Sequence, residues 1–281
     1  MKILILGAKG LLGGALQKVF ANEEVAAYDR EELDVTDFAA LRESVQKIKP
    51  AVIINCVAWN DVDGAEKNPA GARLLNCEVV KELATIVKDL GIILVTYSTD
   101  VVFDGEKQNG YSEDDIPNPI NEYGKSKRAG EEAVEKVGGQ YYIIRTSRLY
   151  GPMPVSAGAK KSFVFIMLDL AKKNQELRVV NEEPAALTNV ADLAMATKQL
   201  IEEKYPYGIY HLVNSSFGTW CDYAREIFAI LKESVKLIPV TRAEFPRPAP
   251  SPRCGILLNT KFPPLRDWRV ALKEFLLEHC S

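Results

Sequence analysis

A glycine-rich loop near the N-terminus is the feature that most restricts the possible folds of this chain. The loop, Gly7-Ala8-Lys9-Gly10-Leu11-Leu12-Gly13, follows a short apolar segment (2–6) and opens a segment with helical spacing (11–20). Glycine lets the backbone turn tightly and lets a diphosphate approach the main-chain N–H groups at a helix N-terminus. A simple tight turn is the alternative explanation, but the strand before and the helix after favour a dinucleotide site. The residues predicted to bind it here are Gly7, Lys9, Gly10, Leu11, Leu12 and Gly13.

Strand and helix patterns alternate through the first half of the chain. We predict strands over 2–6, 25–28, 51–55, 92–97 and 141–145, and helices over 11–20, 38–48, 70–90 and 121–137. Uninterrupted apolar strands separated by helices indicate a parallel sheet covered on both faces. The predicted fold class is therefore α/β, a Rossmann-type doubly wound parallel sheet with a smaller α/β C-terminal substrate lobe. Such sheets bind ligands beyond the carboxyl ends of their strands.

The length of 281 residues suits one large domain or a core with a lobe. We predict a cofactor domain over 1–150 and a smaller lobe over 151–281, with some chain crossing back to the first. In the lobe we predict helices over 163–173, 191–203, 223–232 and 270–279, and strands over 177–180, 208–213 and 235–240. The segment 245–252 contains four prolines, which predicts an extended surface loop.

Charge and composition exclude several classes of protein. A net charge of -3 argues against binding nucleic acid through its phosphates. No apolar run reaches the roughly 18 residues of a membrane helix, and the apolar N-terminal run is too short for a secretory signal. The five cysteines are scattered without a Cys-x-x-Cys pair and there are two histidines, so neither a disulfide framework nor a metal site is expected. We expect a cytoplasmic protein.

Asp29 stands where the second predicted strand ends. A carboxylate there accepts hydrogen bonds from the adenosine ribose, which favours NAD(H). Arg30 follows directly and Lys9 lies within the glycine loop, and both side chains suit the 2′-phosphate of NADP(H). The alternative for Arg30 is a solvated surface charge. We favour NADP(H), with NAD(H) as the second choice.

A second group of polar residues follows the fourth predicted strand. Thr99 ends the segment Tyr97-Ser98-Thr99, and Tyr123 and Lys127 lie four residues apart on one face of a predicted helix. A phenol with a pKa of about 10 is a poor acid at neutral pH. A nearby ammonium stabilises the phenolate and lowers that pKa, while the Thr99 hydroxyl is suited to hold a carbonyl oxygen. The spacing also arises by chance, but of eleven tyrosines only Tyr123 has a lysine at +4.

These motifs together resemble the extended short-chain dehydrogenase/reductases, and within them the dTDP-4-dehydrorhamnose reductase family. The resemblance runs from Met1 to about Glu274. Besides the glycine loop it rests on the segments 32–37, 62–66, 97–105, 119–131, 145–147, 191–194 and 267–268.

The resemblance implies a role for each matching residue. Thr99, Tyr123 and Lys127 would be the catalytic residues that reduce the C4 keto group of a nucleotide-sugar, most simply dTDP-4-dehydro-β-L-rhamnose to dTDP-L-rhamnose. Tyr123 and Lys127 would also contact the cofactor, together with Asp34, Val35, Asn55, Cys56, Val57, Ala58 and Ser98. The substrate would meet Val62, Thr99, Asp100, Tyr123 and Arg148. The expected partner is thus a nucleotide-sugar, and the expected assembly a monomer or homodimer.

The chain departs from the family pattern only on the substrate side. Arg148 replaces a tryptophan, 185–188 keeps only the threonine of a Gly-Ser/Ala-Pro-Thr segment, and 251–257 lacks the usual arginine and serine. Two alternatives therefore stay open: a reductase of a different nucleotide-sugar, and an NADP-binding regulatory subunit resembling that of methionine adenosyltransferase. An epimerase or dehydratase is less favoured, because those relatives usually carry a longer substrate region.

Overall fold

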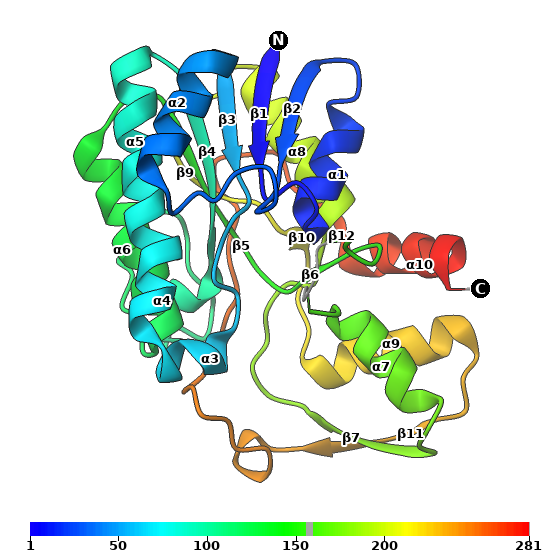
Figure 1. Ribbon diagram of the computed structural model, residues 1–281. Coiled ribbons are helices and arrows are strands. Elements are labelled where there is room, and N and C mark those ends of the chain that lie inside the picture. Colours follow the sequence, from blue (N-terminus) through cyan, green and yellow to red (C-terminus); the bar gives the residue numbers. More distant parts are fainter. Residues whose placement is uncertain (156–159, 281) are drawn as a thin grey trace.

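The computed structural model describes residues 1–155 and 160–280, and its centre is a sheet of six parallel strands (Figure 1). The strand order is β2-β1-β3-β4-β5-β9. The strands are β1 (Lys2–Leu6), β2 (Glu24–Tyr28), β3 (Val52–Asn55), β4 (Ile93–Thr99), β5 (Tyr141–Thr146) and β9 (Gly208–His211). The chain adds β2 on one side of β1 and then crosses to the other side of β1 to add β3. The direction in which strands are added therefore reverses at β1. The predicted α/β class with a doubly wound parallel sheet is confirmed.

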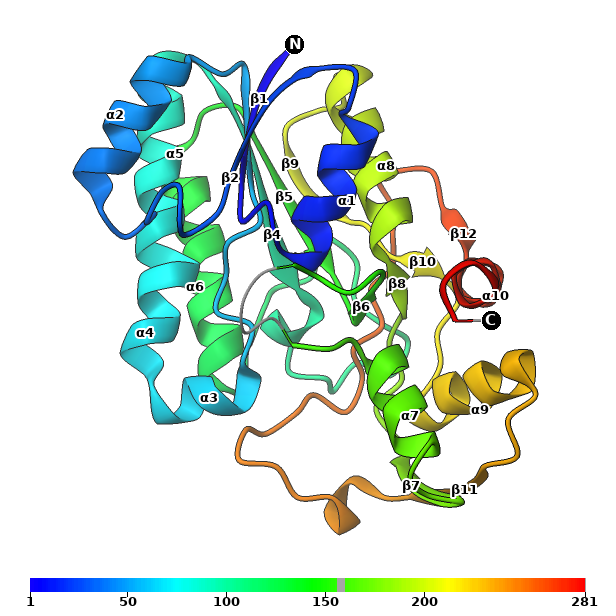
Figure 2. The same cartoon turned by 45° about the vertical axis from the view of Figure 1, so that its right-hand side comes forward.

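Helices cover both faces of this sheet (Figures 1 and 2). On one face α1 (Leu11–Val19) and α8 (Val190–Glu202) pack against Ile3 and Ile5. On the other face α2 (Phe38–Ile48) and α5 (Val79–Leu90) pack against Leu4 and Leu6, and α6 (Glu122–Val137) packs alongside α5. Because successive side chains of a strand point to opposite faces, each apolar strand contributes to two cores, which explains the uninterrupted apolar runs.

The segment 70–90, predicted as one helix, is helical throughout but not regular. It consists of α4 (Pro69–Arg73), a π-helical turn (Leu74–Glu78) and α5. The turn packs tightly on α6, where a Cβ on Gly130 would collide with the carbonyl oxygen of Asn76. The predicted helix is therefore present from Pro69 to Leu90 without a break, but it contains a π-helical turn that periodicity does not register. The short helix α3 (Val62–Lys67) was not predicted.

The smaller lobe has its own core. Helices α7 (Phe163–Ala171), α9 (Trp220–Leu231) and α10 (Trp268–His279) surround buried Tyr223 and Trp268. Strand β7 (Glu176–Val180) pairs with β11 (Lys236–Val240). Two shorter pairs complete the lobe, β6 (Leu149–Tyr150) with β8 (Thr188–Asn189) and β10 (Asn214–Ser215) with β12 (Leu265–Asp267).

Two parts of the second half of the chain pack on the main sheet and the helices around it. The helix α8 and the strand β9 complete the main sheet and its cover. The segment 245–252, which contains neither helix nor strand, passes below α3 in both views (Figures 1 and 2). It is held there by an ion pair of Arg247 with Asp63 at 3.2 Å and by the Asn121 amide, which donates to the Pro250 oxygen at 2.8 Å. Among the described residues, no helix is long and apolar enough to span a membrane.

Candidate active site

The glycine loop packs on the end of β2 and on the start of α1. The N–H groups of Gly7 and Ala8 both donate to the Tyr28 oxygen, at 2.9 and 3.1 Å. Gly7 has φ +75°, which favours glycine. A Cβ on Gly13 would lie 2.8 Å from Ala8 Cα and closer still to the Gly7 oxygen. The loop therefore needs these glycines to fold back on its own helix, and this cradle at a helix N-terminus fits the diphosphate of a dinucleotide.

The loop after β3 lies against the glycine loop. A Cβ on Gly7 would be 3.1 Å from the main-chain atoms of Cys56 and Val57, and the Cys56 N–H donates to the Leu6 oxygen at 2.9 Å. The buried Asn55 side chain accepts from the Val57 N–H at 3.1 Å, which shapes the path towards Ala58. The residues predicted from β1 and β3 thus meet where the strand order reverses, which is where doubly wound sheets bind their ligand.

Asp29 is held in place beside the glycine loop. Its carboxylate accepts from the main-chain N–H of Lys9 at 2.9 Å and of Arg30 at 2.8 Å. The Lys9 ammonium binds the carboxylates of Glu31 and Glu32, the latter at 3.1 Å. The exposed Arg30 side chain forms no hydrogen bond or ion pair in the described part of the chain, so Arg30 is the freer of the two predicted phosphate ligands.

Asp34 and Val35 take different positions after β2. Asp34 is exposed and accepts from the Thr36 N–H and hydroxyl, which holds the pKa of Asp34 below its usual value. Val35 is buried in the core formed with α2. Of the two, only Asp34 presents its side chain to solvent.

Thr99, Tyr123 and Lys127 come together although they arise from two elements. Thr99 is the last residue of β4, and the other two lie on α6; their exposed fractions are only 7%, 8% and 7%. The Lys127 ammonium donates to the Tyr97 oxygen at 2.6 Å. The Thr99 hydroxyl donates to Asp100 at 3.0 Å and accepts from the Val101 N–H at 3.2 Å. Ser98, the preceding residue of β4, is also buried.

Burial dominates the ionisation of this group. The pKa of Tyr123 is raised, because burial disfavours the phenolate; a hydrogen bond with Thr99 opposes this and the charge of Asp100 adds to it. Burial also lowers the pKa of Lys127 to about 8. The pKa of Tyr123 is thus raised and not lowered as the sequence predicts: burial is the largest cause of the shift, and the Lys127 ammonium donates to the Tyr97 oxygen. The buried Tyr123 phenol is therefore neutral at pH 7.

The predicted substrate residues surround this group. Val62, the first residue of α3, packs in the same apolar cluster as Tyr123. Asp100 accepts from the Thr99 and Ser147 hydroxyls, each at 3.0 Å. The pKa of Asp100 is raised by burial, and the charge of Arg148 opposes the shift.

Arg148 is held in the smaller lobe. Its guanidinium stacks on Trp220, 3.9 Å from the ring centroid, and donates to the Glu183 oxygen at 2.5 Å. Its φ is +45°, an unfavourable value for a residue with a side chain. The strain is balanced by the stacking and by these hydrogen bonds.

The three departures from the family pattern lie in one place. Ala185 pairs with Gly255, and the Gly255 N–H donates to the Pro184 oxygen at 2.9 Å. A Cβ on Gly255 would collide with the Asp100 carboxylate. Since Arg148 binds the neighbouring Glu183 oxygen, all three changes come together beside Asp100, where Ala185 and Gly255 are buried. Arg247, a basic residue close in sequence to the segment 251–257, is paired with Asp63.

Sequence reasoning missed several buried polar residues next to the site. Asn76, in the π-helical turn, accepts from the Trp59 N–H at 2.9 Å and donates to Ser126 at 2.9 Å. Glu131 and Arg145 form a buried ion pair. Glu131 and Arg145 lie within the segments 119–131 and 145–147 that carry the family resemblance, and this was the only signal for them in the sequence. Among the described residues, no group of three or more His, Cys, Asp or Glu side chains is placed to hold a metal.

The parallel sheet, the glycine cradle and the buried Thr99, Tyr123 and Lys127 define the class, a dinucleotide-binding oxidoreductase of the short-chain dehydrogenase/reductase type. The model of the RmlD substrate binding domain family matches residues 1–280, and this chain belongs to that family. A dTDP-4-dehydrorhamnose reductase of Streptomyces griseus is 38% identical, over 99% of this chain and 94% of that protein.

Two further relatives bear on substrate and cofactor. A protein of Streptomyces antibioticus named as a probable dTDP-4,6-dihydroxy-2-methyloxan-3-one 4-ketoreductase is 36% identical, over 98% of this chain and 94% of that protein. The crystal structure of a Bacillus anthracis dTDP-4-dehydrorhamnose reductase in complex with NADP is 35% identical, covers 99% of both chains and has a TM-score of 0.93. The resemblance seen in the sequence is confirmed along the whole chain.

Proposed function

We propose that this protein reduces the C4 keto group of a nucleotide-sugar, and that its substrate is dTDP-4-dehydro-β-L-rhamnose, which becomes dTDP-L-rhamnose. The observation that carries the proposal is the buried group of Thr99, Tyr123 and Lys127 at the carboxyl end of β4. Cys56 connects this group to the glycine loop, because its main chain lies against Gly7 and its thiol is close enough to influence the pKa of Lys127. The names of the relatives support the same substrate.

Each of the three residues has a distinct task in the proposed reaction. Bound NADPH supplies the hydride to the C4 carbon. Tyr123, which is neutral at physiological pH, donates its phenolic proton to the C4 oxygen as negative charge develops there. Thr99 donates a hydrogen bond to the same oxygen. Lys127 stabilises the phenolate that remains and holds the ribose next to the nicotinamide.

The proposed cofactor site extends from the glycine loop to β4. We assign to it Gly7, Lys9, Gly10, Leu11, Leu12, Gly13, Asp29, Arg30, Asp34, Val35, Asn55, Cys56, Val57, Ala58 and Ser98, besides Tyr123 and Lys127. The unpaired Arg30 and the NADP complex of the Bacillus anthracis relative support NADP(H). NAD(H) is the second cofactor, because Asp29 is placed to accept from a ribose hydroxyl.

A reductase of another dTDP-sugar is the second candidate. The three sequence departures that meet beside Asp100 favour it, as does the Streptomyces antibioticus relative with a different substrate in its name. In either case we assign Val62, Thr99, Asp100, Tyr123 and Arg148 to the sugar. We further propose that the protein acts in the cytoplasm as a monomer or homodimer.

One assay tests the proposal. Purified protein is mixed with dTDP-4-dehydro-β-L-rhamnose and with NADPH or NADH, and loss of the nicotinamide absorbance is followed. We expect oxidation that Tyr123→Phe reduces by about 10²–10⁴-fold, while Tyr207→Phe, on the surface, leaves it unchanged. Turnover only with another 4-keto dTDP-sugar would support the second candidate. Tight cofactor binding without any turnover would overturn both and favour the regulatory subunit.

A further inference from the structure

A buried ion pair lies directly behind the proposed catalytic lysine. Arg145, near the end of β5, donates from Nε to Glu131 Oε1 and from Nη2 to Glu131 Oε2, each at 2.8 Å. The two side chains are 1% and 2% exposed. Burying two charges costs several kcal/mol of desolvation, so such a pair is weak evidence for stability alone. A role of the pair toward neighbouring residues is therefore the better explanation of its burial.

Glu131 lies one helical turn after Lys127 on α6. Residues at i and i+4 share a helix face, and the Glu131 carboxylate is the main charge that opposes the lowering of the Lys127 pKa. The other ionisable group facing Lys127 is the Cys56 thiol, which is neutral because burial raises its pKa. In the described chain no carboxylate lies within ion-pair distance of Lys127. Its ammonium therefore relies on Glu131 from one turn away.

On its other side Arg145 contacts His211 of β9, which in turn contacts Leu258 of the C-terminal segment. His211 Nε2 lies 3.4 Å from Arg145 Nη1, and His211 Nδ1 lies 3.1 Å from the Leu258 oxygen. Burial and Arg145 keep His211 neutral, with its pKa lowered to about 4. A neutral ring then donates from Nδ1 and accepts from Arg145 at Nε2.

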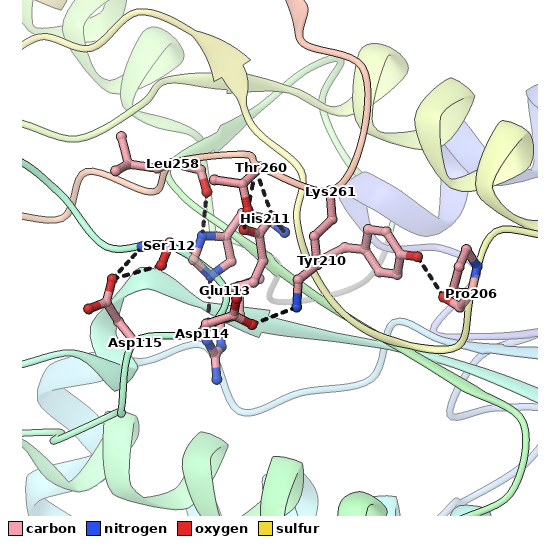
Figure 3. Close-up of polar contacts among 11 residues, drawn as sticks. Ser112, Glu113, Asp114, Asp115, Pro206, Tyr210, His211, Leu258, Thr260 and Lys261 are labelled. Atoms are coloured by element: carbon pink, nitrogen blue, oxygen red, sulfur yellow. Dashed lines mark hydrogen bonds and ion pairs between the residues drawn. The ribbon is translucent and has the colours of Figure 1, made fainter.

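Glu113 contacts both His211 and the C-terminal segment at Thr260. It accepts from the His211 N–H at 3.2 Å and from the Thr260 hydroxyl at 2.6 Å, as Figure 3 shows. Arg145 also lies over the Phe103 ring, 5.1 Å from its centroid. Arg145 is thus contacted by His211 and Phe103 on the sides away from Glu131, and these contacts hold it against the Glu131 carboxylate.

We propose that Glu131 is a positioning residue for the reduction: held by Arg145, its carboxylate keeps the Lys127 ammonium directed at the Tyr97 oxygen and charged beside Tyr123. The inference rests on the proposed function. Arg128, at 3.0 Å from Glu131, is the remaining charged neighbour, and it is shared with the exposed Glu132 and Glu135. Of the two members of the buried pair, Glu131 is therefore the one that lies on α6 with Lys127 and connects Arg145 to it.

The test replaces Glu131 without changing its shape. In Glu131→Gln we expect kcat to fall about tenfold with little change in KM for the sugar. The loss of activity at high pH should move about one unit lower, because removing the negative charge disfavours the ammonium. Glu132→Gln, on the same helix and paired with the same Arg128, is the matched control and should leave both quantities unchanged.

A double variant separates positioning from stability. Glu131→Gln with Arg145→Met removes both buried charges, which often restores stability. If the pair is merely structural, this variant recovers the wild-type kcat and pH profile, and the proposal is wrong. If Glu131 positions Lys127, folding recovers while the pH profile remains shifted.

A measurement that requires no enzymatic turnover tests this inference independently of the proposed function. The pKa of Lys127 is read by NMR of lysine labelled with 13C at Cε, and its signal is assigned by its absence in Lys127→Met. A lower Lys127 pKa in Glu131→Gln supports the inference even if the sugar is not reduced. An unchanged pKa and an unchanged Lys127 chemical shift would overturn it whatever the activity.

Discussion

The Lys127 ammonium donates a hydrogen bond to the main-chain oxygen of Tyr97 at 2.6 Å, which joins the proposed catalytic helix α6 to the central strand β4. The side chain is almost fully buried, and burial lowers its pKa to about 8. The bond places an ammonium at the carboxyl end of the sheet, where no carboxylate of the described residues forms an ion pair with it. Stability and activity should therefore both depend on the protonation of this one residue.

Lys127→Met should change how stability depends on pH. An unfolded lysine titrates near 10.4, and Lys127 titrates near 8 in the native state. Between these values the unfolded chain binds more protons, so stability rises with pH in this window. We expect the difference in free energy of unfolding between wild type and Lys127→Met to change by roughly 2 kcal/mol from pH 7 to pH 10. Urea unfolding at both pH values measures it, and parallel curves would contradict the expectation.

Gly13→Ala should prevent cofactor binding. The added Cβ would lie 2.8 Å from Ala8 Cα in a loop that has no room to move. We expect a loss of about 1–3 kcal/mol in stability and loss of NADPH binding by fluorescence titration. Gly14→Ala is the control one position along, since a Cβ there meets nothing within 4 Å. It should be neutral or stabilise α1 by up to about 1 kcal/mol, and equal effects of the two changes would refute this account of the loop.

Glu31→Gln should favour NADPH over NADH. Glu31 binds the Lys9 ammonium beside Asp29 and makes no other hydrogen bond in the described chain. Without the Glu31 charge the Lys9 ammonium keeps only Glu32 as an ion-pair partner, at 3.1 Å, and is more available to a 2′-phosphate. We expect the ratio of kcat/KM for NADPH to that for NADH to rise about three- to tenfold. Arg30→Ala should lower the same ratio, and an unchanged ratio in both variants would place the phosphate elsewhere.

Arg148→Met should act on the sugar and not on the cofactor. The substitution removes the stacking on Trp220 and the cation that opposes the raised Asp100 pKa. With a more readily protonated Asp100 beside Thr99, we expect kcat/KM for the sugar to fall about tenfold or more. NADPH affinity measured by titration should change by less than about twofold. A parallel loss of NADPH affinity would show that Arg148 supports the whole fold.

The sequence predicted what depends on local spacing. The glycine loop, the alternation of strands and helices, and the i, i+4 spacing of Tyr123 and Lys127 follow from period and residue type. These features led to the parallel sheet, the reductase family and the residues gathered at the carboxyl ends of the strands. They did not reveal the π-helical turn at Asn76, because that turn results from close packing against Gly130 on another helix.

The sequence by itself thus determined the class of fold, the family and the residues assigned to the chemistry. Only the tertiary structure decided that Lys127 is directed to Tyr97, that Glu131 behind it is bound by Arg145, and that the three substrate-side departures meet beside Asp100. The physical reason is distance along the chain. Burial and charge pairing join residues from separate elements, and no local pattern records which distant side chain will share a desolvated space.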